Sequence, residues 1–198
     1  MLYNFDMKKT LYNFFILVFV LLLLCSCSTV SSADINTAED KSNLSFAQIM
    51  EGKCFDKEGN PVTLNSDYYL VYYAANWCPY CKEFQETLKA TALRLQRMYG
   101  NVQFIFAGHI RDVSDQDMLD FLEEGDYNFP YVPIRYREET GIMNLVDVPK
   151  FWIPGFVLLD KKGNVLSSSN GQTEEDYIRD KPLSYYETLQ QCDCLQSF

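Results

Sequence analysis

The stretch Trp77-Cys78-Pro79-Tyr80-Cys81 decides the fold of this chain. It directly follows an apolar and aromatic run, residues 68–75, and directly precedes a helical pattern of apolar residues. A Cys-x-x-Cys motif between a strand and a helix is typical of a redox pair rather than of half a zinc site.

The start of a helix gives the two cysteines different chemistry. Pro79 suits the first helical position, because its φ angle is preset and its missing N–H would be unpaired there anyway. Cys78 then becomes the N-cap residue, whose sulfur can accept hydrogen bonds from the free N–H groups of the first turn. The helix dipole adds partial positive charge at this place, so the thiolate form of Cys78 is favoured. We therefore expect Cys78 to be the attacking thiol and Cys81, one turn further in, to be the resolving thiol.

Zinc binding is the alternative interpretation of the motif. A structural zinc ion usually needs four Cys or His ligands in two pairs. The chain has a single histidine, His109, and its other close pair, Cys192-Asp193-Cys194, has the wrong spacing for a second zinc knuckle. We therefore predict no metal site, and we expect His109 to be a loop or surface residue rather than a catalytic base.

The composition allows one domain with a sizeable core plus terminal extensions, since the chain has 198 residues of which 47% are hydrophobic. The formal net charge is −10, which argues against nucleic acid binding because that requires a basic face. This acidity says little about the binding of a protein substrate.

Residues 1–27 have the pattern of a secretory signal peptide. The short positive segment Lys8-Lys9 is followed by a largely apolar run, residues 11–24, which is too short for a comfortable membrane span. The run ends in Leu24-Cys25-Ser26-Cys27, which resembles the lipobox of bacterial lipoproteins and implies lipidation of Cys27. An uncleaved anchor helix and a plain signal peptide are the alternatives.

Residues 28–45 are rich in Ser, Asn, Thr and charged residues and predict a flexible tether. Together with the signal peptide they predict a domain that is anchored to the membrane through an N-terminal lipid. We expect it in the bacterial cell envelope, facing the periplasm or the exterior, where disulfides are permitted.

Residues 46–198 are the predicted folded domain. Hydrophobic periodicity and turn residues predict the following elements in chain order: a hairpin over 46–64, a strand over 68–75, a helix from 79 to Gly100, a strand over 102–107, a helix over 112–124, a short helix over 134–144, a hairpin over 156–168, and a helical segment over 174–191 that Pro182 breaks or restarts. This order predicts an α/β fold in which helices flank a central mixed β-sheet, with an N-terminal hairpin extension.

Residues 46–192 resemble the thioredoxin fold. Two sites carry the resemblance: Trp77-Cys78-Pro79-Tyr80-Cys81, and Ile153-Pro154, which precedes the strand predicted at 156–160. Within this superfamily residues 71–79 and the turn at 161–164 look most like the tryparedoxins, nucleoredoxins and thioredoxin-like lipoproteins. The Pro-Tyr dipeptide between the cysteines is the one found in glutaredoxins.

The resemblance implies a substrate site around the two cysteines. In the thioredoxin family the proline at the position of Pro154 is cis and packs beside the redox pair, which would turn the backbone of Ile153 towards an extended substrate chain. Trp77 and Tyr80 flank the cysteines, and Trp77 with Phe151-Trp152 would form an apolar rim for a protein substrate. The alternative role for these aromatic residues is to complete the core.

One position departs from the thioredoxin pattern. Thioredoxins place a buried aspartate six residues before the first cysteine, as proton acceptor for the resolving thiol, and Tyr72 stands at that position here. Tyrosine, with an unperturbed pKa of about 10, is a poor base at neutral pH but can donate or relay a hydrogen bond. Tyr72 is therefore either a proton relay for Cys81 or a plain core aromatic residue.

Three cysteines of the mature chain remain: Cys54, Cys192 and Cys194. A structural disulfide from Cys54 to Cys192 or Cys194 would attach the C-terminal helix to the first hairpin. The alternative is that Cys192 and Cys194 form a second redox pair that exchanges electrons with the first.

The motif and the resemblance together predict a thiol–disulfide oxidoreductase that acts on protein thiols and disulfides of the cell envelope and exchanges electrons with an unidentified donor or acceptor. It needs no cofactor besides the redox-active disulfide of Cys78 and Cys81. A Cu(I)-handling module, in which Cys78, Cys81 and His109 bind the metal, is an alternative function. A lipid-anchored binding domain without turnover is another.

Overall fold

The computed structural model describes residues 44–196, with side chains as far as Cys192. The predicted signal peptide, the lipidation site Cys27 and nearly all of the predicted tether lie outside the described residues. Within the described residues, no helix has both the length and the apolar character needed to cross a membrane.

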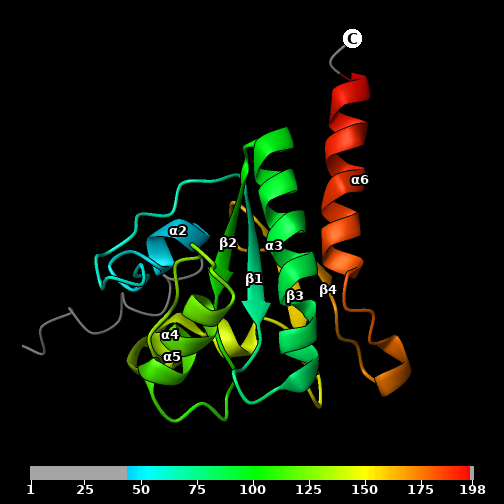
Figure 1. Cartoon of the computed structure of the whole chain (residues 1–198). Helices are drawn as coiled ribbons and strands as arrows, with labels where there is room; N and C mark the ends of the chain where they lie inside the picture. The colour runs from blue at the N-terminus through cyan, green and yellow to red at the C-terminus, as the bar shows by residue number, and fades with distance from the viewer. Residues whose placement is uncertain (1–43, 197–198) are drawn as a thin grey trace, which may run out of the picture. The chain divides into compact units, whose positions relative to one another are not determined.

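A four-stranded mixed β-sheet forms the centre of the domain, in the order β2-β1-β3-β4 (Figure 1). β1 (Tyr68–Tyr73) pairs in parallel with β2 (Val102–Phe106) and antiparallel with β3 (Gly155–Asp160). β3 pairs antiparallel with the edge strand β4 (Val165–Ser168). The mixed sheet that the sequence predicts is thus confirmed.

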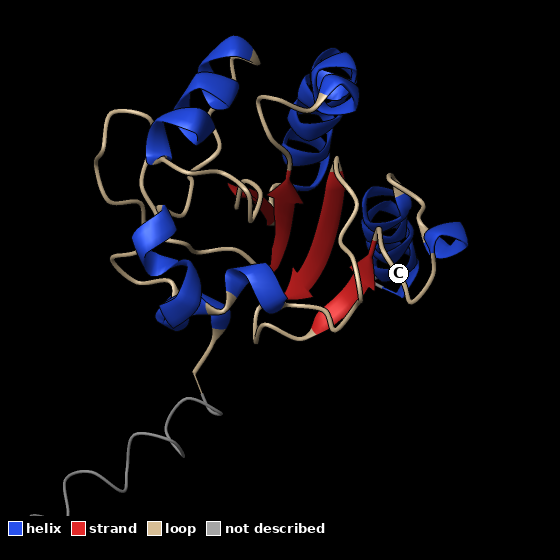
Figure 2. Ribbon diagram, turned by 90° about the horizontal axis from the view of Figure 1, so that it is seen from below, coloured by secondary structure: helices blue, strands red, loops and turns tan. Residues whose placement is uncertain are grey.

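Helices cover both faces of this sheet (Figure 2). One face packs against α3 (Pro79–Tyr99), α4 (Asp115–Glu124) and α6 (Lys181–Gln196), which contribute the side chains of one core cluster. The other face packs against α2 (Phe46–Ile49) and the segments around Cys54 and Ile142. β1 supplies both clusters alternately, Leu70 and Tyr72 to the first and Tyr69 and Val71 to the second, which explains its continuous apolar sequence.

α3 forms as its sequence predicts. Pro79 is its first residue and Cys78 its N-cap, and its buried stripe includes Phe84 and Leu88 at helical spacing. Gly100 ends the helix in the left-handed region with φ of +72°. This conformation costs a glycine little, because glycine has no Cβ.

The N-terminal hairpin predicted within residues 46–64 is present only around its turn, where the N–H of Asp56 donates to the carbonyl oxygen of Asn60 and the N–H of Val62 to that of Cys54, both at 2.9 Å. Ser45 and Gln48 form a reciprocal capping box, which starts the short helix α2 instead of a strand. Of the expected strand pairing only an isolated bridge between Phe55 and Pro61 is present, and Phe55 also bridges to Tyr131. Pro61 has no N–H to extend a ladder, so the segment continues as an irregular loop over the sheet.

The remaining elements are short or begin where proline allows. The helix predicted over 134–144 is divided into three pieces: η2 (Ile134–Tyr136), α5 (Arg137–Thr140) and η3 (Ile142–Asn144). Towards the C-terminus, the single turn η4 (Glu174–Asp176) precedes α6. Pro182 is the second residue of α6, so it restarts the helix as predicted.

The predicted disulfide between Cys54 and Cys192 is not formed. Both residues are unpaired, Cys54 buried and Cys192 exposed. Cys54 belongs to the core cluster on one face of the sheet, whereas α6 packs against the other face through Leu183 and Tyr186. The sheet therefore separates the two thiols. The side chain of Cys194, the other predicted partner, lies outside the described residues.

Candidate active site

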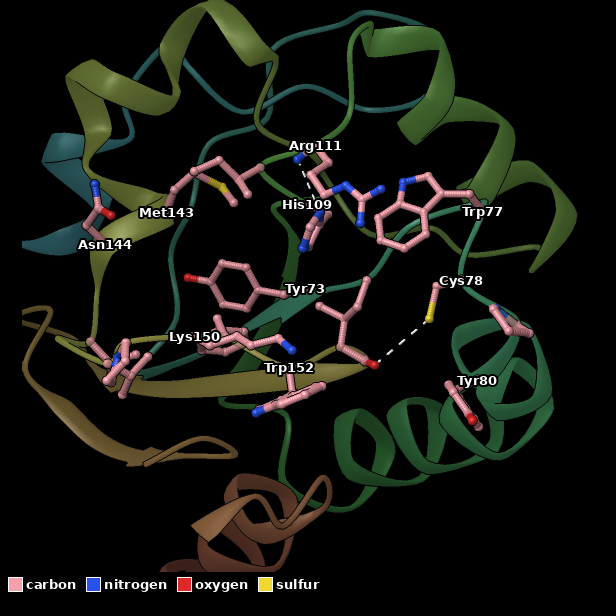
Figure 3. A pocket seen from close by; sticks show the side chains of 17 residues that line it. Tyr73, Trp77, Cys78, Tyr80, His109, Arg111, Met143, Asn144, Lys150 and Trp152 are labelled. Atoms are coloured by element: carbon pink, nitrogen blue, oxygen red, sulfur yellow. Dashed lines mark hydrogen bonds between the residues drawn. The ribbon is translucent and has the colours of Figure 1, made fainter. Parts of the chain in front are cut away.

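The two cysteines of the motif occupy different environments at the start of α3. Cys78 is the N-cap residue, and its sulfur accepts a hydrogen bond from the backbone N–H of Cys81 at 3.3 Å. The Cys78 sulfur also lies 3.9 Å from the carbonyl oxygen of Ile153, in a long S–H···O contact that Figure 3 shows as a dashed line. A backbone N–H at a helix start, such as that of Cys81, stabilises a negative charge on the sulfur that accepts from it.

Cys81 lies behind Cys78 and is completely buried. Burial raises the pKa of its thiol well above the ordinary value, and its hydrogen bond with the Cys78 side chain raises the pKa further. A thiol held in its neutral form inside the core cannot attack an approaching substrate. It can react only with the neighbouring sulfur of Cys78.

The Ile153–Pro154 peptide bond is cis, as the resemblance implies. Two side chains from the segment after β4 fix the backbone at this place. Tyr177 donates its hydroxyl to the carbonyl oxygen of Pro154 at 2.6 Å. Asn170 accepts from the N–H of Trp152 at 2.7 Å and donates to its carbonyl oxygen at 3.2 Å. The loop that faces Cys78 is therefore attached to the body of the domain on both sides of Ile153.

A cavity of about 630 Å³ opens beside Cys78. Its lining comes from four places: Tyr73 at the end of β1, the start of α3 with Trp77 and Tyr80, the loop after β2, and the segment between residues 143 and 153. In Figure 3 these side chains surround an open space into which the sulfur of Cys78 points. Trp77 is 49% exposed and Tyr80 is 68% exposed, so both are available to a partner. Cys78 lines the cavity, whereas Cys81 does not.

The loop after β2 packs against Trp77. The His109 ring meets the Trp77 ring edge-on, with centroids 5.1 Å apart, and Arg111 places its guanidinium carbon 4.6 Å from the Trp77 ring centroid. The Nδ1 atom of His109 accepts the backbone N–H of Arg111 at 3.1 Å. Burial lowers the pKa of His109, although nearby Asp112 opposes this shift. His109 is thus a loop residue, as predicted, and it lies half-buried at the cavity rim.

A buried ion pair fixes the same loop from below. The Arg137 guanidinium lies 3.2 Å from Asp112 and donates to the carbonyl oxygens of Ala107 and His109 at 2.8 and 2.9 Å. Asp112 also accepts the N–H of His109 at 2.6 Å. A Cβ at Gly108, where φ is +70°, would approach Asp112 Oδ2 to 2.5 Å, so only glycine fits there.

Tyr72, in β1, is completely buried, and its ring stacks on the ring of Phe156 with centroids 4.7 Å apart. Its hydroxyl is buried without a hydrogen-bond partner among the described residues. Burial first, and then the neighbouring Tyr127, Cys81 and Cys78, raise the pKa of Tyr72. The group is therefore a neutral phenol next to the redox pair.

The structure gathers Trp77, Cys78, Tyr80 and Ile153 around one cavity, and it places Cys54 and Cys192 elsewhere. Sequence reasoning missed several residues of the site. Arg111 and Lys150 have only their nearness in sequence to His109 and to Phe151-Trp152 as a signal. Arg137, Asn170 and Tyr177 have no sequence signal, because each acts on backbone far away in the chain.

The described side chains bear on the alternative of metal binding. Among them, no group of three His, Cys, Asp or Glu residues lies close enough together to hold a metal ion. No observation in this part of the chain favours the Cu(I) alternative.

The amino-acid sequence has a distant relative among known proteins. No family model matches the chain. Human nucleoredoxin is 22% identical over 126 residues, which are 62% of this chain and 28% of nucleoredoxin. The chain thus spans little more than a quarter of the length of this relative.

Solved structures share the arrangement of elements. Tryparedoxin II complexed with glutathionylspermidine is similar with a TM-score of 0.50 at 16% sequence identity, over 61% of this chain and 84% of that chain. Thioredoxin from Wuchereria bancrofti has a TM-score of 0.49 at 20% identity, over 64% of this chain and 81% of that chain.

The chain therefore has a thioredoxin-like fold: a mixed four-stranded sheet flanked by helices, with a cysteine pair at the start of α3 and a cis-proline opposite it. Cys78 and Cys81 form a Cys-x-x-Cys motif at the first turn of α3.

Proposed function

We propose that this protein is an exported thiol–disulfide oxidoreductase, tethered to the membrane through Cys27, that acts on protein substrates of the cell envelope. One observation supports the chemistry above all. Cys78 opens onto a cavity at a helix start, whereas Cys81 is completely buried directly behind it. Export and lipidation are supported by the N-terminal sequence pattern alone.

The first step is attack of the Cys78 thiolate on one sulfur of a substrate disulfide. The substrate S–S bond breaks, a mixed disulfide between Cys78 and the substrate forms, and the other substrate sulfur leaves as a thiolate. The N–H of Cys81, 3.3 Å from the Cys78 sulfur, and the dipole of α3 stabilise the attacking anion. Ile153 lines the cavity next to the reacting sulfur, where its backbone can meet an extended substrate chain.

In the second step Cys81 loses its proton and attacks the Cys78 sulfur. The mixed disulfide breaks and the second substrate sulfur leaves as a thiol. The substrate disulfide has then been reduced by two electrons, and Cys78 and Cys81 have been oxidised to a disulfide. The Cys81 thiol is neutral because burial raises its pKa, so the proton needs an acceptor.

The leaving substrate sulfur is the acceptor that this environment favours. Tyr72 is already protonated, because burial raises its pKa, and its hydroxyl has no described acceptor to which it could pass a proton on. A proton passed from Cys81 to Tyr72 could therefore go no further among the described residues. The proton of Cys81 moves instead to the departing substrate thiolate, which gains basicity as the mixed disulfide breaks.

The favoured direction is reduction or isomerisation. No His or Lys lies between the cysteines to stabilise the reduced form strongly. We expect a reduction potential between those of thioredoxin and the glutaredoxins, about −270 to −200 mV. A measured potential near the strong-oxidant value of about −120 mV would reverse the direction.

A trapping experiment tests the function. In the Cys81→Ser protein the mixed disulfide on Cys78 cannot be resolved, so disulfide-linked partners should accumulate in the cell envelope and disappear on reduction. The Cys78→Ser/Cys81→Ser protein should capture none, and Cys54→Ser should reduce insulin as fast as the parent. Absence of both trapped partners and insulin reduction would refute the proposal and favour a binding domain without turnover.

A further inference from the structure

The walls of the cavity beside Cys78 carry two cations and no carboxylate. Among its 17 lining residues the charged side chains are Arg111 and Lys150, with His109 close to Arg111. The chain as a whole has 17 Lys and Arg against 27 Asp and Glu. A cavity of positive sign in an acidic protein is a local departure from its surroundings, and it lies directly at the reacting sulfur.

Arg111 and Lys150 also differ in their contacts from the cations of the domain that form ion pairs. Seven ion pairs connect described side chains, and they use other Lys and Arg residues. Arg111 instead lies over the ring of Trp77, with 4.6 Å between guanidinium carbon and ring centroid. Lys150 lies over the ring of Trp152, with 3.1 Å between its Nζ atom and the ring centroid.

These two stacks use both tryptophans of the chain, one on each side of the cavity (Figure 3). Stacking on an aromatic face holds a long cationic side chain in place without neutralising its charge. A stacked guanidinium still presents its N–H groups at its edge, where a carboxylate can accept two of them. Both cations are exposed and have no carboxylate partner among the described residues, so their charge is available to a ligand.

We propose that this cavity selects protein disulfides whose cysteine lies among aspartate and glutamate residues, with Arg111 and Lys150 as the groups that bind their carboxylates. The inference rests on the proposed disulfide exchange at Cys78 and names its substrate class. An extended chain advances about 3.3 Å per residue, so side chains on both sides of a substrate cysteine can reach the two walls. His109 and the buried Arg137–Asp112 pair hold the Arg111 wall in position.

The test uses five-residue peptides, blocked at both ends, with a central cysteine and four identical flanking residues: aspartate, serine, lysine or leucine. The cysteine is joined to 2-thiopyridine, a neutral leaving group. Cys78 attacks the peptide sulfur and releases 2-thiopyridone, which is followed by its absorbance; Cys81 then releases the peptide thiol. Each rate constant is divided by that of the same peptide with dithiothreitol, which removes the intrinsic effect of the flanking charges on the disulfide.

The expected order is aspartate over serine over lysine, with an aspartate-to-serine ratio of about 3 to 10, as for two exposed ion pairs. The ratio should fall in 1 M salt, where the Debye length is about 3 Å. In Arg111→Gln/Lys150→Gln it should fall to about one. Arg97→Gln/Lys162→Gln is the matched control, because it also removes two exposed charges, on α3 and after β3, that do not line the cavity, and it should retain the ratio.

Each result decides the matter. An aspartate-to-serine ratio of one, or a leucine peptide that reacts faster than the aspartate peptide, would overturn the acidic specificity while disulfide exchange stands. A ratio that survives in Arg111→Gln/Lys150→Gln would overturn the assignment to these two residues. If the parent protein reduces none of the four peptides and no insulin, the proposed function itself fails.

Discussion

Replacing Tyr72 with phenylalanine should stabilise the protein. The Tyr72 hydroxyl is buried without a hydrogen-bond partner among the described residues. Mutational data put the cost of such a group at about 1–3 kcal/mol. Phenylalanine keeps the stack on Phe156, whose centroid is 4.7 Å away, so the packing of the ring is retained. We expect Tyr72→Phe to raise the free energy of unfolding by about 1 kcal/mol, or Tm by about 2–4 °C for a domain of this size.

The neighbouring residue of β1 provides a matched control with the opposite sign. The Tyr73 hydroxyl donates to the carbonyl oxygen of Ile142 at 2.5 Å, and both residues are buried. Tyr73→Phe removes the same oxygen atom from the same strand but leaves a buried carbonyl unpaired, which should cost about 1–3 kcal/mol. Both tyrosines are buried in the same strand, and the expected difference in sign comes from whether the hydroxyl has a partner.

Urea unfolding of the reduced proteins, followed by tryptophan fluorescence, measures both effects, and equal m-values establish that the free energies can be compared. A loss of about 1 kcal/mol or more in Tyr72→Phe would show that the hydroxyl has a partner and that our reasoning is wrong. The same variant tests the proton route. Release of peptide thiol after attack at Cys78 should proceed at the parental rate, and a tenfold slower release would make Tyr72 the relay.

Three further predictions follow from the burial of charged and titratable groups. Arg137→Met should lower the free energy of unfolding in urea by about 3–5 kcal/mol, because it leaves Asp112 buried without its cation. Arg97→Met, on the exposed face of α3, should lower it by less than about 0.5 kcal/mol. A similarly small loss in both variants would contradict a stabilising buried pair. Burial raises the pKa of Cys54 to about 12, so iodoacetamide at pH 8 should modify exposed Cys192 in the native protein and reach Cys54 only after denaturation, as mass spectrometry can determine. Burial lowers the pKa of His109, whereas in the unfolded chain this histidine binds a proton near about pH 6.5. The contribution of neutral His109 to stability should therefore be complete above that pH and fall as the pH drops towards the folded pKa. In His109→Gln the urea midpoint should depend less on pH between about pH 7 and 5.5, and an unchanged pH dependence would exclude His109 as its cause.

Local patterns in the sequence were sufficient for the central part of the domain. The helix over 79–99 follows from Pro79, the buried stripe and Gly100, all of which act within a few residues. The role of Cys78 as N-cap is equally local, since its sulfur meets the N–H of a residue three positions along. The prediction held only in part over residues 46–64, where Phe55 and Pro61 form an isolated antiparallel bridge that does not extend into strands, and where Ser45 and Gln48 start a helical turn.

The rest of the site depends on contacts between distant parts of the chain. Lys150 has an apolar and aromatic sequence neighbourhood, and only the folded loop places it across the cavity from Arg111. Asn170 and Tyr177 hold the backbone of residues 152–154 from more than 15 positions away. Hydrophobic periodicity carries no information on such pairs, because it describes positions within one segment and not which distant segment packs against it.

The sequence by itself determined that a strand leads into a helix with two cysteines at its start, and that the second cysteine lies deeper than the first. Backbone geometry and hydrophobic spacing act over a few residues, so a short stretch is enough. Only the tertiary structure decided that a sheet separates Cys54 from α6, that Tyr72 has no hydrogen-bond partner, and that two cations stacked on tryptophans stand beside Cys78. These outcomes depend on which face of the sheet each segment covers, and that is settled by packing of the whole domain.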